Sequence, residues 1–289
     1  MQQSRSEFID VRGLRAHLRI WGRAGAPRVF VLHGWLDVSG TFQFLVDELL
    51  KHGDWEVVAP DFRGFGLSEW PQDGYWFPDY YADFEVMLNH YLPEGAATVI
   101  GHSMGAHIAS AYAGLRPART GRLVLLDGLN MPDMPADTAP KRIRVWLDQL
   151  GKPPRLRSYE SYETLAERIR KHHPKLTPER ALAVAHCWGQ SGENGRIALC
   201  ADPKHELRNP LLYRAAEAHA IWREVTADTL FIDGADSPFG KMLDAKETEL
   251  RRNCFRQHRQ SVVPDCGHMM HFEQPEATAQ QIAQFLNAG

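Results

Sequence analysis

Short, compact apolar runs alternate with segments of helical spacing over the first part of the chain. The apolar runs lie at residues 28–33, 55–60, 98–103 and 123–128. The segments of helical spacing lie at residues 41–51, 78–92 and 104–115. Compact apolar runs are typical of strands that are buried on both faces. Their alternation with helices therefore predicts a parallel sheet with helices on both sides.

The pattern continues at both ends of the chain and is interrupted once. Further strands are expected at 8–11 and 15–21 around a turn at Arg12-Gly13, and at 228–234 and 259–268, with a closing helix at 275–287. Residues 129–224 instead have the pattern of helices and loops, with several prolines near their start. We interpret the chain as one core domain, residues 1–128 and 225–289, that carries a helical insertion over 129–224.

Composition narrows the class of protein. The 289 residues are 44% hydrophobic and 24% charged, which is the balance of an ordinary globular domain. The net charge of -3 gives no basic excess, so nucleic acid is not expected as a partner. Between Lys141 and Lys175, however, ten Lys or Arg stand against four Asp or Glu. This segment is either a solvated helical face or a positive rim that attracts anionic substrates.

Cysteine spacing and apolar run length bear on metal binding and location. The four cysteines form no C-x-x-C pair, so we expect free thiols and no metal site; they are Cys187, Cys200, Cys254 and Cys266. The first residues lack the apolar stretch of a signal peptide. A run of about 18 apolar residues, as a membrane span requires, is also absent from the sequence. We therefore expect a cytoplasmic protein with no membrane span.

The segment Gly101-His102-Ser103-Met104-Gly105 fits the pattern G-x-S-x-G. A predicted strand leads into it and a helix of small residues leads out, which is the context that holds such a serine exposed on a sharp turn as a nucleophile. The glycines supply the space that this turn needs. The following helix dipole favours negative charge developing near Ser103. The alternative is a glycine-flanked helix start with Ser103 as its N-cap.

A serine nucleophile needs a general base, and His268 is the candidate. It lies beyond the last predicted strand, in a glycine-containing loop before the closing helix. His271 is expected to be structural, and His102 to pack against the sheet. The oxyanion needs two backbone N–H donors. We expect one from Met104, directly after the nucleophile, and the other from Trp35, in the loop after the third strand.

Four motifs in this order resemble those of α/β-hydrolase-fold proteins over nearly the whole chain. They are His33-Gly34-Trp35, the stretch from Asp61 to Ser68, the segment from Gly101 to Gly105, and Gly267-His268 with Glu273-Gln274-Pro275. Within this family, the stretches His33–Asp37 and Leu125–Gly128 look most like the kraken-like or serine-hydrolase-like group. The resemblance implies an α/β fold with a mostly parallel eight-stranded sheet flanked by helices. It also implies a helical cap after strand six.

The histidine needs a carboxylate that fixes its tautomer, and two aspartates compete for this role. Asp236 follows the seventh strand, which is the commonest place for the acid in the family, but the usual spacing puts Ser237 at that position. Asp127 ends the sixth strand at the same sheet edge as Ser103. A charge there needs a reason, because burying it unpaired is costly. Asp127 is slightly favoured, Asp236 stays the alternative, and Asp233 is a weaker candidate.

These residues predict a serine hydrolase that cleaves a carboxylic ester or lactone through an acyl-enzyme, without a metal or organic cofactor. A small-molecule substrate is the expected partner, and the chain is expected to be a monomer or a homodimer. Candidates for the pocket wall are His102, Trp146 and Trp188. Two other functions stay open. One is a cofactor-free oxygenase that uses His268 and its aspartate as a base, and the other is a non-catalytic binder on a hydrolase scaffold.

Overall fold

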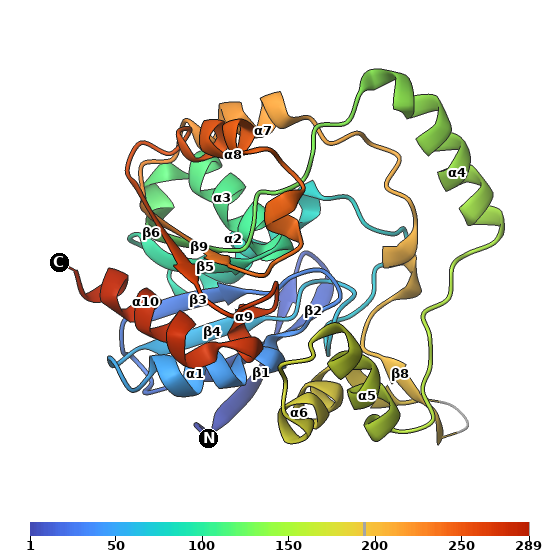
Figure 1. The fold of residues 1–289 in the computed structure, drawn as a ribbon, viewed down its shortest axis with the longest axis horizontal. Coiled ribbons are helices and arrows are strands. Elements are labelled where there is room, and N and C mark those ends of the chain that lie inside the picture. The colour runs from blue at the N-terminus through green and yellow to red at the C-terminus, as the bar shows by residue number, and fades with distance from the viewer. Residues whose placement is uncertain (193–194, 289) are drawn as a thin grey trace.

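An eight-stranded sheet is the central layer of the computed structural model, which describes residues 1–192 and 195–288 (Figure 1). The strand order is β1-β2-β4-β3-β5-β6-β9-β10. Strand β2 runs antiparallel to both β1 and β4, and the other neighbouring strands of this sheet pair in parallel over the described residues. The strands are β1 (Ser4–Val11), β2 (Leu14–Trp21), β3 (Arg28–Leu32), β4 (Glu56–Pro60), β5 (Ala97–His102), β6 (Thr120–Leu126), β9 (Asp228–Gly234) and β10 (His258–Val263). The predicted mostly parallel sheet is confirmed.

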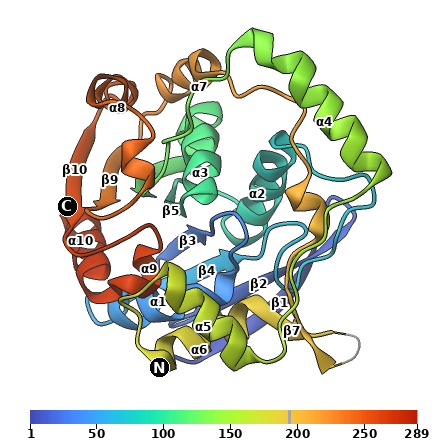
Figure 2. The same ribbon diagram turned by 45° about the vertical axis from the view of Figure 1, so that its right-hand side comes forward.

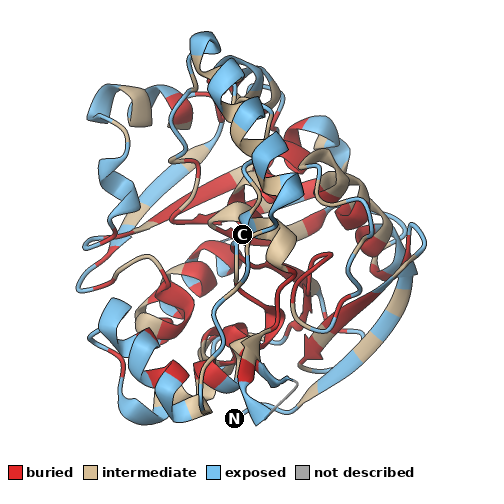
Figure 3. Ribbon diagram, turned by 90° about the vertical axis from the view of Figure 1, so that its right-hand side faces the viewer, coloured by how far each residue is buried: buried red, intermediate tan, exposed pale blue. Residues whose placement is uncertain are grey.

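Helices cover both faces of the sheet, because the central strands are apolar on both sides. In β3, Phe30 packs into one hydrophobic cluster and Val31 into the other, since successive residues point to opposite faces. The first cluster contains α2 (Pro78–Tyr91), α3 (Met104–Leu115) and α7 (Ala215–Trp222). The second contains α1 (Gln43–Leu49), α9 (Met270–Glu273) and α10 (Pro275–Asn287). Figure 3 shows the buried strands between exposed outer helix faces.

Between β6 and β9 the chain leaves the sheet and forms most of one side of the molecule (Figure 2). This part contains α4 (Ala139–Gly151), α5 (Tyr162–His172), α6 (Pro178–Trp188) and a hairpin of β7 (Gly189–Ser191) and β8 (Ile197–Leu199). Helices α5 and α6 share a small core that includes Phe272. In helix α4, all of whose residues the structure describes, no residue is buried.

Helix α7 ends the 129–224 segment and packs on α3 of the core. The indole Nε1 of Trp222 donates a hydrogen bond to Ser110 Oγ at 3.0 Å. The cap and its boundaries at 129 and 224 stay a prediction.

Some local features depart from the expected pattern. The strand expected at 259–268 ends at Val263, because Pro264 follows and Asp265 has a φ of 52°. The pattern does not predict α8 (Ala245–Arg252), since this helix is mostly charged and lacks an apolar stripe. It also misses the β7–β8 hairpin, whose three-residue strands are too short to show a period. In the described residues, no helix combines the length and apolarity needed to cross a bilayer.

Candidate active site

Ser103 lies on a strained turn between β5 and α3, with φ 52° and ψ −113°. Such a backbone is unfavourable for a residue other than glycine and persists only where the surroundings enforce it. Here the packing is tight: a Cβ on Gly105 would lie 2.1 Å from the carbonyl oxygen of Leu32. A Cβ on Gly101 would lie 2.4 Å from the carbonyl oxygen of Gly105. The Ser103 side chain makes no capping hydrogen bond, in contrast to the N-cap alternative.

The loop after β3 lies against this turn. A Cβ on Gly34 would lie 3.2 Å from Cβ of Ser103. Within the described ranges, the amides of Trp35 and Met104 donate no hydrogen bond to the backbone. Met104 is in the first turn of α3, where amides lack a helical acceptor. Both predicted donors are therefore available to an anionic oxygen.

His268 lies in the loop after β10 and pairs with Asp127. Its Nδ1 is 2.5 Å from Oδ2 of Asp127, which is only 2% exposed. Asp127 directly follows β6, and its N–H donates to the carbonyl oxygen of Ile232 at 2.9 Å. The N–H of Ser103 donates to the carbonyl oxygen of Leu126 at 3.0 Å, so the aspartate emerges beside the serine turn. Because the carboxylate faces Nδ1, that nitrogen carries the proton and Nε2 keeps its lone pair.

The side chains of the other candidate acids pair with residues other than His268. The side chain of Asp236 is 56% exposed and forms an ion pair with Lys175 at 2.6 Å. Asp233 pairs with an arginine of α8, and its pKa is raised by burial. The position that the usual spacing gives to the acid is taken by Ser237. Its Oγ donates to Oδ2 of Asp127 at 2.5 Å.

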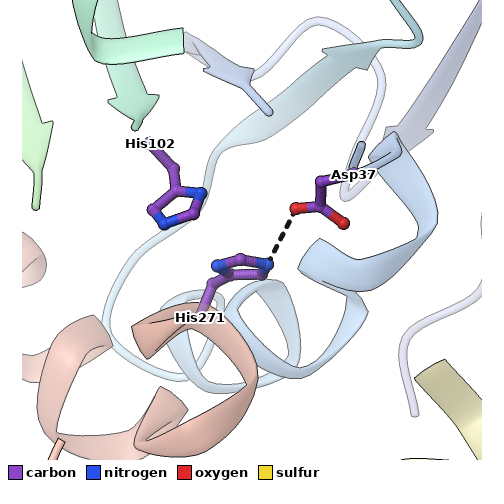
Figure 4. A group of neighbouring side chains, drawn as sticks. All are labelled: Asp37, His102 and His271. Atoms are coloured by element: carbon purple, nitrogen blue, oxygen red, sulfur yellow. Dashed lines mark ion pairs between the residues drawn. The ribbon is translucent and has the colours of Figure 1, made fainter. Parts of the chain in front are cut away.

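A fully buried polar group lies behind these residues and is called here the Asp37 cluster: Asp37, His102 and His271 (Figure 4). His102 donates from Nε2 to the carbonyl oxygen of His268 at 2.9 Å. Its ring centroid lies 4.7 Å from those of His268 and His271. Burial, together with these two histidines, lowers the pKa of His102 well below its ordinary value, so the ring is neutral. His102 thus lies beneath the site and not in an exposed pocket wall.

The Asp37 cluster is the group of described residues that could hold a metal ion, since its ligand atoms lie within 4.8 Å of one another. Asp37 nevertheless has protein partners already. Its Oδ1 accepts hydrogen bonds from Thr41 Oγ1 and Trp188 Nε1, both at 2.8 Å. Its Oδ2 lies 3.1 Å from Nε2 of His271. The protein's own side chains thus surround this carboxylate.

The two predicted pocket tryptophans have different surroundings. Trp188 ends α6, and its ring centroid lies 6.0 Å from that of Phe272 while its indole donates to Asp37. Trp146 is half-buried on α4. The structure therefore brings Trp188 to the loop of the predicted oxyanion donor and leaves Trp146 on an outlying helix.

Sequence reasoning missed three supporting roles. Ser237 holds Asp127, and Asp37 joins several loops. Glu273 accepts from the amides of Gly267 and Met269 at 2.7 and 3.3 Å, which fixes the loop of His268. A signal existed for Ser237, because it occupies the usual acid position. For the two acids the signal was their place in the motifs His33–Asp37 and Glu273-Gln274-Pro275.

The chain belongs to the alpha/beta hydrolase family, whose model matches residues 29–281. A serine hydrolase-like protein of Danio rerio is 28% identical over 297 residues, which cover 99% of this chain and 90% of that protein. The 3-hydroxybutyrate-oligomer hydrolase of Cupriavidus necator is 32% identical over 273 residues, covering 90% of this chain and 88% of that protein. The thioesterase domain from the curacin biosynthetic pathway has the same fold, with a TM-score of 0.86 at 24% identity and coverage of 98% and 99%.

The predicted fold class and the resemblance to the serine-hydrolase-like group are thereby confirmed. The relatives carry hydrolase names, which supports hydrolase activity for this chain.

Proposed function

We propose that the protein is a serine hydrolase that cleaves a carboxylic ester or lactone through an acyl-enzyme. The observation that carries this proposal is the pairing of His268 with Asp127 beside the strained turn of Ser103. In this proposal, Ser103 is the nucleophile, His268 is the base in the required tautomer, and the two unpaired amides hold the oxyanion at the same sheet edge. This combination is what acyl transfer needs.

In the proposed reaction, Nε2 of His268 accepts the hydroxyl proton of Ser103 while the serine oxygen attacks the substrate carbonyl carbon. The amides of Trp35 and Met104 donate to the oxyanion that forms. Asp127 stabilises the imidazolium. His268 then returns its proton to the leaving alcohol, which leaves the acyl group esterified to Ser103. A water molecule activated by the same histidine releases the acid.

The proposed cap over 129–224 would set the substrate. Of the ten basic residues between Lys141 and Lys175, only Lys175 pairs with an acid among the described residues. This unpaired positive charge supports a preference for anionic acyl substrates. Because one relative is named a 3-hydroxybutyrate-oligomer hydrolase, oligoesters of hydroxy acids, which carry a terminal carboxylate, are the first anionic substrates to test.

A fluorophosphonate probe tests the nucleophile, and p-nitrophenyl esters of increasing chain length test the activity. Wild-type protein should be labelled, and Ser103→Ala should lose both labelling and turnover. Ser110→Ala is the matched control, because this buried serine lies on the same helix and bonds to Trp222. Folded wild-type protein that resists labelling, with Ser103→Ala unchanged in every hydrolytic assay, would refute the proposal.

A second candidate follows from the place of Asp127 directly after β6, which suits a cofactor-free oxygenase of the same fold. His268 would then take a proton from a heteroaromatic substrate, and oxygen would react with the carbanion. The hydrolase is preferred because such a reaction leaves Ser103 without a role. Oxygen uptake with a hydroxyquinolone, and no turnover of esters, would reverse this preference. Ligand binding without labelling or turnover would instead favour the non-catalytic binder.

A further inference from the structure

Asp37 is a fully buried carboxylate that the proposed reaction does not use. It lies two residues after Trp35, the proposed oxyanion donor, and is 0% exposed. A buried carboxylate is costly unless it is paired and hydrogen-bonded. Thr41 and Trp188 donate to its Oδ1, and His271 faces its Oδ2. Burial alone raises the pKa of Asp37, but the contact with His271 and the neighbouring histidines outweigh it and hold the pKa well below its ordinary value.

The first connection of Asp37 is to the loop that carries Trp35. The N–H of Asp37 donates to the carbonyl oxygen of Gly34 at 3.3 Å, which closes a tight turn around Trp35. Within this turn Leu36 has a φ of 57°. A strained backbone of this kind persists only where neighbouring contacts hold it. The anchored side chain of Asp37 supplies such contacts at the end of the turn, and so fixes the direction of the Trp35 amide.

The second connection is to the loop of His268. His271 lies three residues after it, and Nε2 of His271 is 3.1 Å from Oδ2 of Asp37 (Figure 4). His102 packs against the rings of both histidines and bonds to the carbonyl oxygen of His268. The loop of the base is thus held from two sides, by His271 on Asp37 and by His102 next to the nucleophile.

The third connection is to helix α6. Trp188, the last residue of α6, donates its indole N–H to the same carboxylate. Gly40 lies close to this helix as well, since a Cβ there would be 3.1 Å from Sγ of Cys187. Asp37 is therefore the point where the proposed cap meets the two loops that carry the base and one oxyanion donor.

We propose that Asp37 is a positioning residue: its carboxylate fixes the loops of Trp35 and His268 relative to each other and connects both to α6. The inference rests on the proposed function, because it concerns the geometry of that same reaction. Asp37 does not touch the substrate in this role, so its loss changes the alignment of reacting groups and not the binding of the ground state. Misplacement of a catalytic group by about 1 Å costs on the order of 100-fold in rate.

The main test replaces Asp37 with Asn, which keeps the shape and removes the charge. We expect kcat for a p-nitrophenyl ester to fall about 100-fold while KM stays within about threefold, and fluorophosphonate labelling to slow in parallel. Asp83→Asn is the matched control: Asp83 is 2% exposed, and its side-chain partners among the described residues are Arg63 at 2.5 Å and Arg12 at 3.2 Å, not the residues of the Asp37 cluster. It should lower the melting temperature and leave kcat unchanged.

Several results would overturn the inference. Folded Asp37→Asn with wild-type kcat would do so, and so would an equal loss of kcat in Asp83→Asn, since that would mark a general effect of stability. If Asp37→Asn does not fold, Trp188→Phe decides. This change removes the indole N–H donor and keeps an aromatic ring at the position, and kcat should fall about fivefold. Its control is Trp222→Phe, which loses a buried indole hydrogen bond elsewhere and should keep its kcat.

Failure of the proposed function gives a different result. In that case the wild-type protein itself is neither labelled nor active on any ester, and the positioning role falls with it. Active wild-type protein with unchanged Asp37 and Trp188 variants would refute only the positioning role.

Discussion

Asp127→Asn is the change that tests the proposed triad most sharply. Oδ2 of Asp127 accepts hydrogen bonds from both Ser237 and His268, whereas Oδ1 is buried without a hydrogen-bond partner. An asparagine can therefore keep its carbonyl oxygen toward both donors and place its amino group where Oδ1 was. The tautomer of His268 is then retained. What the variant loses is the negative charge that stabilises the imidazolium.

The size of this loss follows from the distance between the charges. Both charges are spread over their groups, so the charge centres of a hydrogen-bonded carboxylate and imidazolium lie about 4 Å apart and attract each other by about 4 kcal/mol at an effective dielectric constant of about 20. Each 1.4 kcal/mol corresponds to about a factor of ten in rate. We therefore expect kcat/KM of Asp127→Asn to fall about 1,000-fold.

The assay compares kcat/KM on one p-nitrophenyl ester for wild type, Asp127→Asn and Asp236→Asn, with melting temperatures measured in parallel. Asp236 is exposed and pairs with Lys175, and exposed pairs contribute little. Its asparagine variant should keep activity within about twofold. Near-normal activity in Asp127→Asn, together with loss of activity in Asp236→Asn, would show that the acid has been assigned to the wrong residue.

Three further outcomes are expected. Ser237→Ala removes a hydrogen bond to the buried Asp127 and should lower kcat/KM about tenfold, measured on the same ester; an unchanged value would show that this contact does not hold the acid. Gly105→Ala places a Cβ against the Leu32 carbonyl and should lower the free energy of unfolding by more than about 2 kcal/mol, which denaturant titration measures. Burial alone raises the pKa of Glu273, but hydrogen bonds from His173 and two amides outweigh it and lower the pKa overall. The ionised form therefore stabilises the fold above the unfolded pKa of 4.5, and this contribution is lost as the pH falls through the lower pKa of the folded state. The melting temperature of Glu273→Gln should accordingly lie below that of wild type at pH 7, and the gap should narrow below pH 4.5; a gap that persists unchanged in acid would contradict this.

The sequence predicted the elements that have strong local signals. Apolar runs that become β3, β4, β5 and β6 are buried on both faces, so their hydrophobicity alone marks them. The elements it missed lack such a signal: α8 is mostly charged, and β7 and β8 have three residues each. The strand expected to run to residue 268 stops at Val263 because Asp265 has a positive φ, which the apolar pattern does not encode.

What the sequence determined by itself is the serine turn. Gly101 is required by a contact within one strand–turn–helix unit, with the carbonyl of Gly105, so this part of the motif carries its own structural reason, whereas Gly105 is required by the Leu32 carbonyl of the neighbouring strand β3. The carboxylate partner of His268, in contrast, could not be identified from contacts between residues close in the sequence. Asp127 and Asp236 have comparable sequence contexts, and only the pairing of β6 with its neighbours puts Asp127 at 2.5 Å from His268 while Asp236 meets Lys175. The meeting of Asp37 with Trp188, 151 residues away, likewise depends on how α6 packs. Local spacing fixes a turn, but contacts between distant segments are set by packing that no local pattern contains.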